Sequence, residues 1–336
     1  MKRIALCVLM LMMVCSAALA DVQQRALKAA QRTLPEGVLA QTVTLFEGTD
    51  HALSGELIMP AGADETTPYV IFAHGSGPSD MDETIGANKP FRDLAYDLAA
   101  LGVGSLRHDK ITYSHPQHPC ETVEQEYLEP AREAIRILRE MTAAQRVYLI
   151  GHSEGGMLTP YLVDQCGFDG GISLAGTPLE LWEISMAQNL AVIALMPQDQ
   201  QPALLAQIEP ERDKGILLSQ MSEEEAKTQT VFGMPGTYLW HMARMDQAQI
   251  AAQSGKPFMF LWGDADFQVE RAAFEAWQER LGASERYAYI VYPGLNHLFM
   301  PAGEDDSILN AQAAYAQPKQ VDRRVADDIA AWIFAN

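Results

Sequence analysis

One serine lies where a strand pattern gives way to a helix pattern. Residues 147–150 form a short apolar run that predicts a buried strand, and helix-like spacing follows from Gly155. Between them, Gly-His-Ser-Glu-Gly (151–155) matches the pattern G-x-S-x-G, in which glycines permit a sharp turn that exposes the serine hydroxyl at the start of a helix. We therefore predict that Ser153 is a nucleophile for acyl transfer.

A serine hydroxyl attacks a carbonyl only with the help of a histidine base that a carboxylate orients. Both residue types follow later predicted strands, in the chain order serine, acid, histidine that such a turn requires. His297 follows the apolar run 289–292 and is the last histidine of the chain, so we predict that it is the base. The run 258–262 precedes two acids, Asp264 and Asp266, and the residues alone leave either able to reach the histidine.

A glycine-rich loop follows an early strand pattern. The apolar run 69–73 leads into His-Gly-Ser-Gly-Pro (74–78), where an exposed backbone N–H can point at a carbonyl oxygen that gains negative charge. We predict the Ser76 N–H as one such oxyanion donor and the Glu154 N–H, next to the nucleophile, as the other. His74 is predicted to be a structural, hydrogen-bonded histidine of this loop.

Strand and helix patterns alternate along most of the chain. Strands are expected at 43–46, 53–59, 69–73, 102–106, 147–150, 171–174, 257–262 and 287–292, and helices at 91–101, 129–141, 156–163, 272–281 and 321–334. This alternation predicts an α/β fold with a mostly parallel sheet flanked by helices. From 179 to 256 the runs are helix-like only (181–196, 202–208 and 239–250), so we expect a helical lid insertion, with methionines as core filler or as the lining of an apolar pocket.

The first 20 residues have the features of a secretory signal peptide. Lys2 and Arg3 precede an apolar run, 4–14, that is too short for a membrane span, and Ala18-Leu19-Ala20 forms a small-residue cleavage site before Asp21. We expect a mature chain with core segments 21–178 and 257–336 around the lid at 179–256. The predicted location is the periplasm, with secretion across the inner membrane and no stable membrane insertion of the mature chain.

The charge restricts the class of partner. The formal net charge is -20, and it becomes -22 when Lys2 and Arg3 leave with the signal peptide. Such a chain is a poor partner for nucleic acid, for anionic membrane surfaces and for polyanionic substrates such as coenzyme A esters. A neutral or cationic small molecule fits this charge.

The motifs together resemble those of the α/β-hydrolase superfamily and, more closely, of a group of bacterial carboxylesterases of the EstD type. The likeness covers most of the chain from residue 69 onward and rests on residues 74–95, 106–110, 151–158, 263–269 and 292–299. It implies an α/β-hydrolase fold whose lid follows the strand after the nucleophile helix, and hydrolysis of short to medium acyl esters. It also implies Asp266 as the acid, because Gly263, Asp266 and Val269 satisfy the usual pattern G-x-x-D-x-x-V.

Other functions stay open on the sequence. The same acyl-serine chemistry could act on amide, peptide or thioester bonds, and a chain that had lost catalysis could be a binding protein on this scaffold. The loop residues His108, His115, His118 and Cys120 could bind a transition metal, although their spacing fits no firm zinc pattern. Our prediction is a serine carboxylesterase that acts on a small-molecule ester and needs no metal or organic cofactor.

Two smaller expectations concern the residues around the site. Cys120 and Cys166 are the two cysteines that remain after loss of the signal peptide, and in an oxidising compartment they could form a disulfide. Arg107, Asp109 and Lys110 are expected to form a charged network below the site with a structural role.

Overall fold

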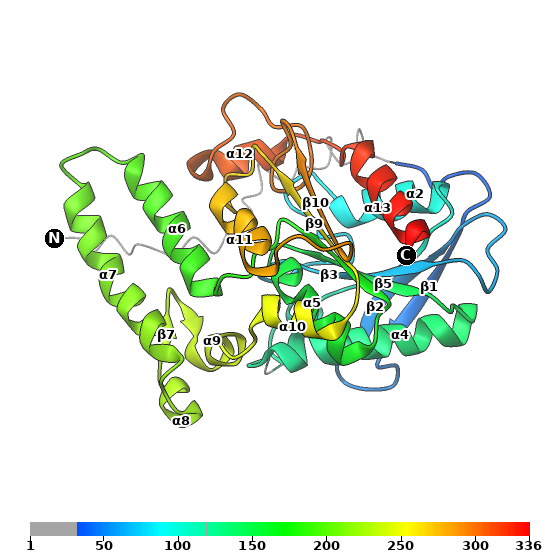
Figure 1. Ribbon diagram of the computed structural model, residues 1–336, viewed down its shortest axis with the longest axis horizontal. Helices are drawn as coiled ribbons and strands as arrows, with labels where there is room; N and C mark the ends of the chain where they lie inside the picture. Colours follow the sequence, from blue (N-terminus) through cyan, green and yellow to red (C-terminus); the bar gives the residue numbers. More distant parts are fainter. Residues whose placement is uncertain (1–31, 119) are drawn as a thin grey trace.

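The computed structural model describes residues 32–118 and 120–336. An eight-stranded sheet runs through the centre of the molecule in the order β1-β2-β4-β3-β5-β6-β9-β10 (Figure 1). Its strands are β1 (Leu39–Leu45), β2 (Leu53–Met59), β3 (Tyr69–Ala73), β4 (Gly104–His108), β5 (Val147–His152), β6 (Gly170–Leu174), β9 (Phe258–Gly263) and β10 (Tyr287–Tyr292). β2 is antiparallel to both neighbours, whereas all pairs from β4 to β10 are parallel. The predicted, mostly parallel sheet is confirmed.

Helices cover both faces of this sheet, whose strands β3, β4, β5, β6 and β9 are buried along their whole length. Side chains of α2 (Pro90–Ala100), α12 (Ala311–Ala316) and α13 (Arg323–Ala335) pack on one face. The π-helix η1 (Glu124–Leu128), α4 (Glu129–Thr142), α5 (Glu154–Cys166) and α11 (Arg271–Leu281) pack on the other. Successive strand residues point to opposite faces of the sheet. Ile71 of β3 therefore lies in the core with α4 and α5, and Phe72 lies in the core with α2 and α13.

Residues 179–256 join β6 to β9 and contain mostly helices. They form α6 (Leu181–Ala194), α7 (Gln201–Leu218), α8 (Glu223–Ala226), the short pair β7 (Thr230–Val231) and β8 (Met234–Pro235), α9 (Gly236–Met242) and α10 (Gln247–Ser254). α6 and α7 lie beyond one end of the sheet (Figure 1), and a small separate core that includes Ile193, Ile208 and Phe232 joins them to the rest of the segment. In contrast, Ala248 and Ala251 of α10 pack in the same core as α5.

The secondary structure differs from the expected pattern at a few places. The helix expected at 239–250 is two helices, since α9 ends at Met242 and the Asp246 side chain caps α10 by accepting the Gln249 N–H at 2.9 Å. The helix expected at 202–208 is longer, since α7 extends to Leu218. The short helices α3 (Ile111–Ser114) and α8 and the 3-10 helix η2 (Ile308–Asn310) were not expected from the sequence. The signal peptide expected at residues 1–20 lies outside the described residues.

The loop after β4 shows no shared ligand set for a metal. The His108 Nδ1 lies 2.8 Å from the Asp109 carbonyl oxygen, and the His115 Nε2 lies 2.8 Å from that of Ala52. Across residues 32–118 and 120–336, no three His, Cys, Asp or Glu side chains gather as metal ligands.

The two cysteines of the described residues, Cys120 and Cys166, are free thiols. Burial raises the pKa of Cys120 to about 12.

Within the described residues, no helix has both the length and the apolar character needed to cross a membrane.

Candidate active site

The turn between β5 and α5 holds Ser153 in an uncommon backbone conformation. Its φ of 52° and ψ of -114° cost a non-glycine residue about 1–3 kcal/mol and persist only where the surrounding structure fixes them. The Ser153 N–H donates to the Leu174 carbonyl oxygen at 2.8 Å. A Cβ on Gly155 would lie 2.3 Å from the Ala73 carbonyl oxygen, so glycine is required where α5 approaches β3. The partly exposed Ser153 side chain is thereby presented above the strand ends.

A buried histidine and acid lie together beyond β9 and β10. The His297 Nδ1 lies 2.7 Å from Asp266 Oδ2, and the two residues are 3% and 9% exposed. Asp266 Oδ1 accepts the Gln268 N–H at 2.7 Å and the Val269 N–H at 3.0 Å. Because an ionised carboxylate can only accept, Nδ1 carries a proton, and in the neutral imidazole the lone pair is then on Nε2. This is the tautomer that a general base needs.

Asp264, the other acid after β9, has a different partner. It is exposed, and its Oδ1 accepts the Gly294 N–H at 2.6 Å. This bond ties the loop after β9 to the loop after β10, and among the described residues Asp264 makes no hydrogen bond to His297. Of the two acids that the residues alone leave open, the geometry therefore brings Asp266 to the histidine.

His297 lies beside the residue that precedes Ser153. The His297 ring lies 4.7 Å, centroid to centroid, from the ring of His152, the residue before the serine. The described residues include no hydrogen bond from the Ser153 hydroxyl to His297. Such bonds are often long without substrate and tighten in the complex, so the proximity is compatible with proton transfer.

Both predicted oxyanion donors are unpaired. In the described parts of the chain, neither the Ser76 N–H nor the Glu154 N–H donates to another residue. The loop of Ser76 is fixed to α5 by the Gly155 N–H, which donates to the His74 carbonyl oxygen at 3.0 Å. Two backbone donors are thus held beside Ser153 and are free to bind a developing negative charge.

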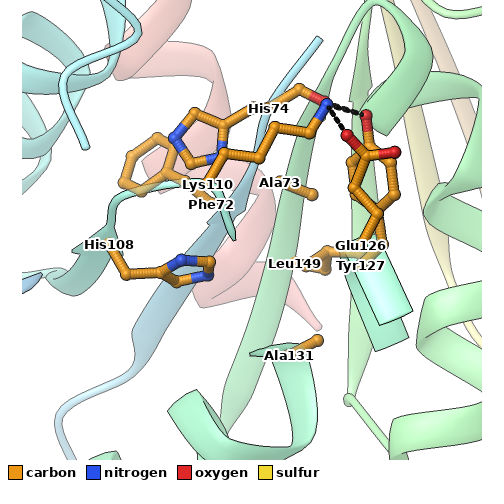
Figure 2. A pocket seen from close by; sticks show the side chains of 9 residues that line it. All are labelled: Phe72, Ala73, His74, His108, Lys110, Glu126, Tyr127, Ala131 and Leu149. Atoms are coloured by element: carbon orange, nitrogen blue, oxygen red, sulfur yellow. Dashed lines mark hydrogen bonds and ion pairs between the residues drawn. The ribbon is translucent and has the colours of Figure 1, made fainter. Parts of the chain in front are cut away.

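A buried lysine holds the predicted oxyanion loop, because the Lys110 Nζ donates to the Gly75 carbonyl oxygen at 2.8 Å. The same Nζ donates to the Tyr127 hydroxyl at 2.7 Å and pairs with Glu126 at 2.9 Å (Figure 2). These side chains line a cavity of about 10 Å³, which is room for about one water molecule and not for a substrate. Lys110 therefore belongs to the support of the site.

His74 has the structural contacts expected of it. Its Nε2 lies 3.0 Å from the Asp80 carbonyl oxygen, and the side chain is buried. Burial, together with His108 and Lys110 nearby, holds the pKa of His74 well below its usual value. A neutral histidine with a fixed backbone partner anchors the loop, and in the part of the chain that the structure describes its ring makes no hydrogen bond to Ser153.

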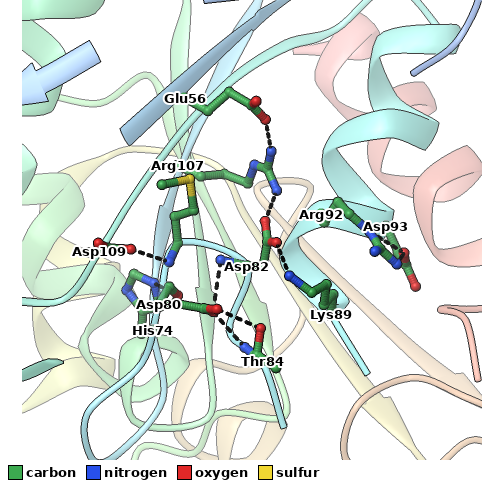
Figure 3. Close-up of polar contacts among 11 residues, drawn as sticks. Glu56, His74, Asp80, Asp82, Thr84, Lys89, Arg92, Asp93, Arg107 and Asp109 are labelled. Atoms are coloured by element: carbon green, nitrogen blue, oxygen red, sulfur yellow. Dashed lines mark hydrogen bonds and ion pairs between the residues drawn. The ribbon is translucent and has the colours of Figure 1, made fainter. Parts of the chain in front are cut away.

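The three residues expected to form one charged network have separate partners, and Lys110 pairs with Glu126 as described above. The buried Arg107 guanidinium lies between Asp82 and Glu56, and Asp82 also accepts a hydrogen bond from Lys89 Nζ at 2.7 Å (Figure 3). Asp109 Oδ1 accepts the Met81 N–H at 2.8 Å. These contacts tie the loop that follows the oxyanion residues to β4 and β2.

Replacing Arg107 with methionine is expected to lower the free energy of unfolding by about 3 kcal/mol, because Asp82 and Glu56 lose a buried partner. Urea denaturation of both proteins measures the change. Arg324→Met is the control, since Arg324 pairs with Asp322 on the surface, and it is expected to leave stability nearly unchanged. Equal stability of the two variants would contradict a structural role for Arg107.

The inserted segment reaches the site through one tyrosine. The Tyr238 hydroxyl, on α9, donates to Glu154 Oε1 at 2.7 Å, and both side chains are buried. Burial raises the pKa of Glu154, and the charge on Lys110 and the hydroxyls of Tyr238 and Ser76 offset part of that rise. Glu154, whose N–H is the second predicted oxyanion donor, is therefore in direct contact with the segment 179–256.

Several contacts of the site have no signal in the sequence. Nothing in the sequence predicts the roles of Glu83, His152, Tyr127 or Tyr238, because each depends on side chains that meet across long chain separations. The pattern G-x-S-x-G indicates that His152 and Glu154, at its two x positions, lie beside the serine. It does not indicate which side chains they contact.

Comparison with known proteins agrees with this geometry. Residues 70–309 match the family model described as the alpha/beta hydrolase family. Esterase EstD of Thermotoga maritima is similar, with 35% identity over 301 residues, which cover 89% of this chain and 70% of that protein.

Solved structures share the fold at lower identity. Est1E from Butyrivibrio proteoclasticus superposes with a TM-score of 0.54 at 15% identity, covering 88% of this chain and 99% of its own. The esterase Pf2001 of Pyrococcus furiosus gives a TM-score of 0.52 at 15% identity, covering 80% and 89%. These matches support the α/β-hydrolase architecture expected from the sequence.

Proposed function

The chain belongs to the α/β-hydrolase family, and on that basis we propose that it is a serine carboxylesterase that hydrolyses short to medium acyl esters. The observation that carries the proposal is the strained Ser153 next to a buried Asp266–His297 pair and two unpaired backbone donors. The similarity to Esterase EstD supports an ester as the substrate.

In the first half-reaction, His297 Nε2 takes the Ser153 proton as Oγ bonds to the ester carbonyl carbon. The carbonyl electron pair moves onto oxygen, and the Ser76 and Glu154 N–H groups stabilise this oxyanion. When the electron pair returns, the bond to the alkoxy group breaks and the alcohol leaves with the proton from His297. Asp266 accepts the Nδ1 hydrogen bond throughout and stabilises the transient imidazolium.

In the second half-reaction, water takes the place of the alcohol. His297 removes a proton from water, whose oxygen bonds to the acyl carbon, and the same two N–H groups hold the oxyanion. Collapse breaks the bond to Oγ, and the proton on His297 passes to Ser153. The carboxylic acid leaves, and no metal or organic cofactor enters either step.

Residues 179–256 serve in this proposal as a lid over an apolar acyl pocket built partly from methionines. The negative charge of the chain favours neutral or cationic esters over polyanionic ones. We also propose secretion to the periplasm, for which N-terminal sequencing of protein from that compartment should begin at Asp21.

The test is labelling of the mature protein with a fluorophosphonate, followed by peptide mapping, alongside turnover of matched esters, thioesters and aminoacyl anilides. We expect one adduct, on the peptide that contains Ser153, and the largest kcat/KM for the esters. Dominant turnover of anilides would replace the esterase with an amidase. A folded protein that forms no adduct would indicate a binding protein on this scaffold.

A further inference from the structure

Glu83 is a buried acid that the proposed reaction does not use. It lies in the loop between β3 and α2 and is 1% exposed. Its Oε1 accepts the Gly75 N–H at 2.6 Å, and its Oε2 lies 3.0 Å from His152 Nδ1. The backbone of Glu83 has a φ of 52°, which is costly for a residue with a side chain. Its carboxylate is therefore held in place between the oxyanion loop and the nucleophile strand.

His152 extends this contact to the loop of the proposed base. Its Nε2 lies 3.0 Å from the His297 carbonyl oxygen, and the two rings are in contact. Because a carbonyl oxygen only accepts, His152 Nε2 must carry a hydrogen and donate it. The residue before Ser153 thus fixes the backbone of His297.

The second nitrogen of His152 determines the charge of the pair. Nδ1 faces the Glu83 carboxylate. Because a neutral His152 has its hydrogen on Nε2, its Nδ1 lone pair would point at this negative charge. An imidazolium instead presents an N–H group to the carboxylate. The two atoms are close but poorly aligned for a hydrogen bond, so the attraction acts chiefly between charges. Burial lowers the pKa of His152, but Glu83, the His297 carbonyl and Asp266 outweigh it, and the net pKa is raised.

The same groups converge on Gly75. A Cβ at Gly75 would lie 3.2 Å from Glu83 Oε1, 3.2 Å from the Ser153 Cβ and 3.5 Å from His152 Nδ1. The oxyanion loop, the nucleophile turn and the buried pair are thus packed with no space between them. A shift of one of these segments must move the others.

We propose that Glu83 and His152 form a positioning pair that fixes the oxyanion loop and the His297 loop relative to Ser153. The inference rests on the proposed function, because it concerns the placement of that reaction's groups. One carboxylate holds Gly75, next to the Ser76 donor, and holds His152, which in turn holds His297. Misplacement of reacting groups by about 1 Å can cost on the order of 10²-fold in rate.

Substitutions of Glu83 separate positioning from charge. Glu83→Gln keeps an acceptor for the Gly75 N–H and offers an N–H donor to a neutral His152, so the contacts are retained. Glu83→Ala removes both. We expect Glu83→Ala to lower kcat on the order of 10²-fold with KM nearly unchanged and to slow fluorophosphonate labelling in proportion, and Glu83→Gln to stay within about tenfold of the unaltered protein.

Asp93→Ala is the matched control. Asp93 is also fully buried, and it pairs with Arg92 and accepts the Val321 N–H at 3.4 Å, away from the site. Its loss should lower the melting temperature as Glu83→Ala does but leave kcat nearly unchanged. Equal losses of kcat in both alanine variants would mean that general destabilisation explains the effect, and the proposal would fall.

A spectroscopic measurement tests the pair without turnover. The ¹⁵N shifts of labelled histidine at about pH 6 should show both His152 nitrogens protonated in the unaltered protein, and a neutral ring with Nε2–H in Glu83→Gln. The groups that face this ring are Glu83, His297, Asp266 and His74. A neutral His152 in the unaltered protein would overturn the pair.

The two proposals fail in different ways. If the unaltered protein turns over esters and is labelled at Ser153 while Glu83→Ala does so equally well, the positioning pair is wrong and the esterase stands. If the unaltered protein is neither active nor labelled, the esterase is wrong, and the nitrogen shifts of His152 still decide whether the charged pair exists.

Discussion

Replacing Ser153 with alanine is expected to lower kcat for a short acyl ester on the order of 10⁶-fold, the loss typical of removing the nucleophile from a serine hydrolase. In the proposed mechanism the Ser153 Oγ bonds to the acyl carbon, and among the described non-glycine residues with a positive φ only Ser153 carries a hydroxyl. Turnover of p-nitrophenyl butyrate measures the loss. The fluorophosphonate adduct should disappear as well.

Ser76→Ala is the matched control for this variant. Ser76 is proposed to act through its backbone N–H, which alanine retains, so kcat is expected to stay within about tenfold of the unaltered value. Melting curves establish that both variants are folded. A Ser153→Ala protein that kept most of its activity would rule out the acyl-serine route and with it the whole assignment of roles.

Short apolar runs made several strands predictable from sequence. β3 is buried on both faces and has the expected bounds, and β10 has them too although most of its residues are only partly buried. The inserted segment was harder to predict. Helical periodicity continues from α9 into α10, and only the cap at Asp246 shows that the chain turns between them. A local hydrogen bond there outweighs the pattern.

The main residues of the site follow from chain order and parallel topology. β5, β9 and β10 run the same way, so the residues after each strand meet at one edge of the sheet. That rule places Ser153, His297 and the two acids after β9 at this edge, whereas the choice of Asp266 over Asp264 comes from the resemblance to known esterases. It cannot place Glu83, which reaches His152 from a loop whose conformation depends on a positive φ and on Gly75. Side-chain pairs of this kind depend on tertiary packing, which the sequence pattern does not record.

Asp266→Asn is expected to lower kcat on the order of 10⁴-fold, because the two N–H groups beside it determine how the new amide is oriented. Gln268 and Val269 donate to Oδ1 at 2.7 and 3.0 Å, so the asparagine oxygen must occupy that position. Its NH₂ group then faces His297 Nδ1 as a donor. His297 responds by moving its proton to Nε2, and a protonated Nε2 cannot accept the Ser153 proton.

Asp264→Asn is the control, two residues away and of the same chemistry. Among the described residues, only the Gly294 N–H donates to the Asp264 carboxylate. An asparagine oxygen can replace that acceptor, so kcat is expected to change by less than about threefold. Kinetics on the same ester compare the two variants, and the ¹⁵N shifts of His297 report the tautomer in Asp266→Asn. If Asp264→Asn carried the larger loss, the acid would have to be reassigned. If Asp266→Asn lost activity while His297 kept its proton on Nδ1, the carboxylate would act through its charge on the imidazolium, and orientation of the ring would be the lesser part of its role.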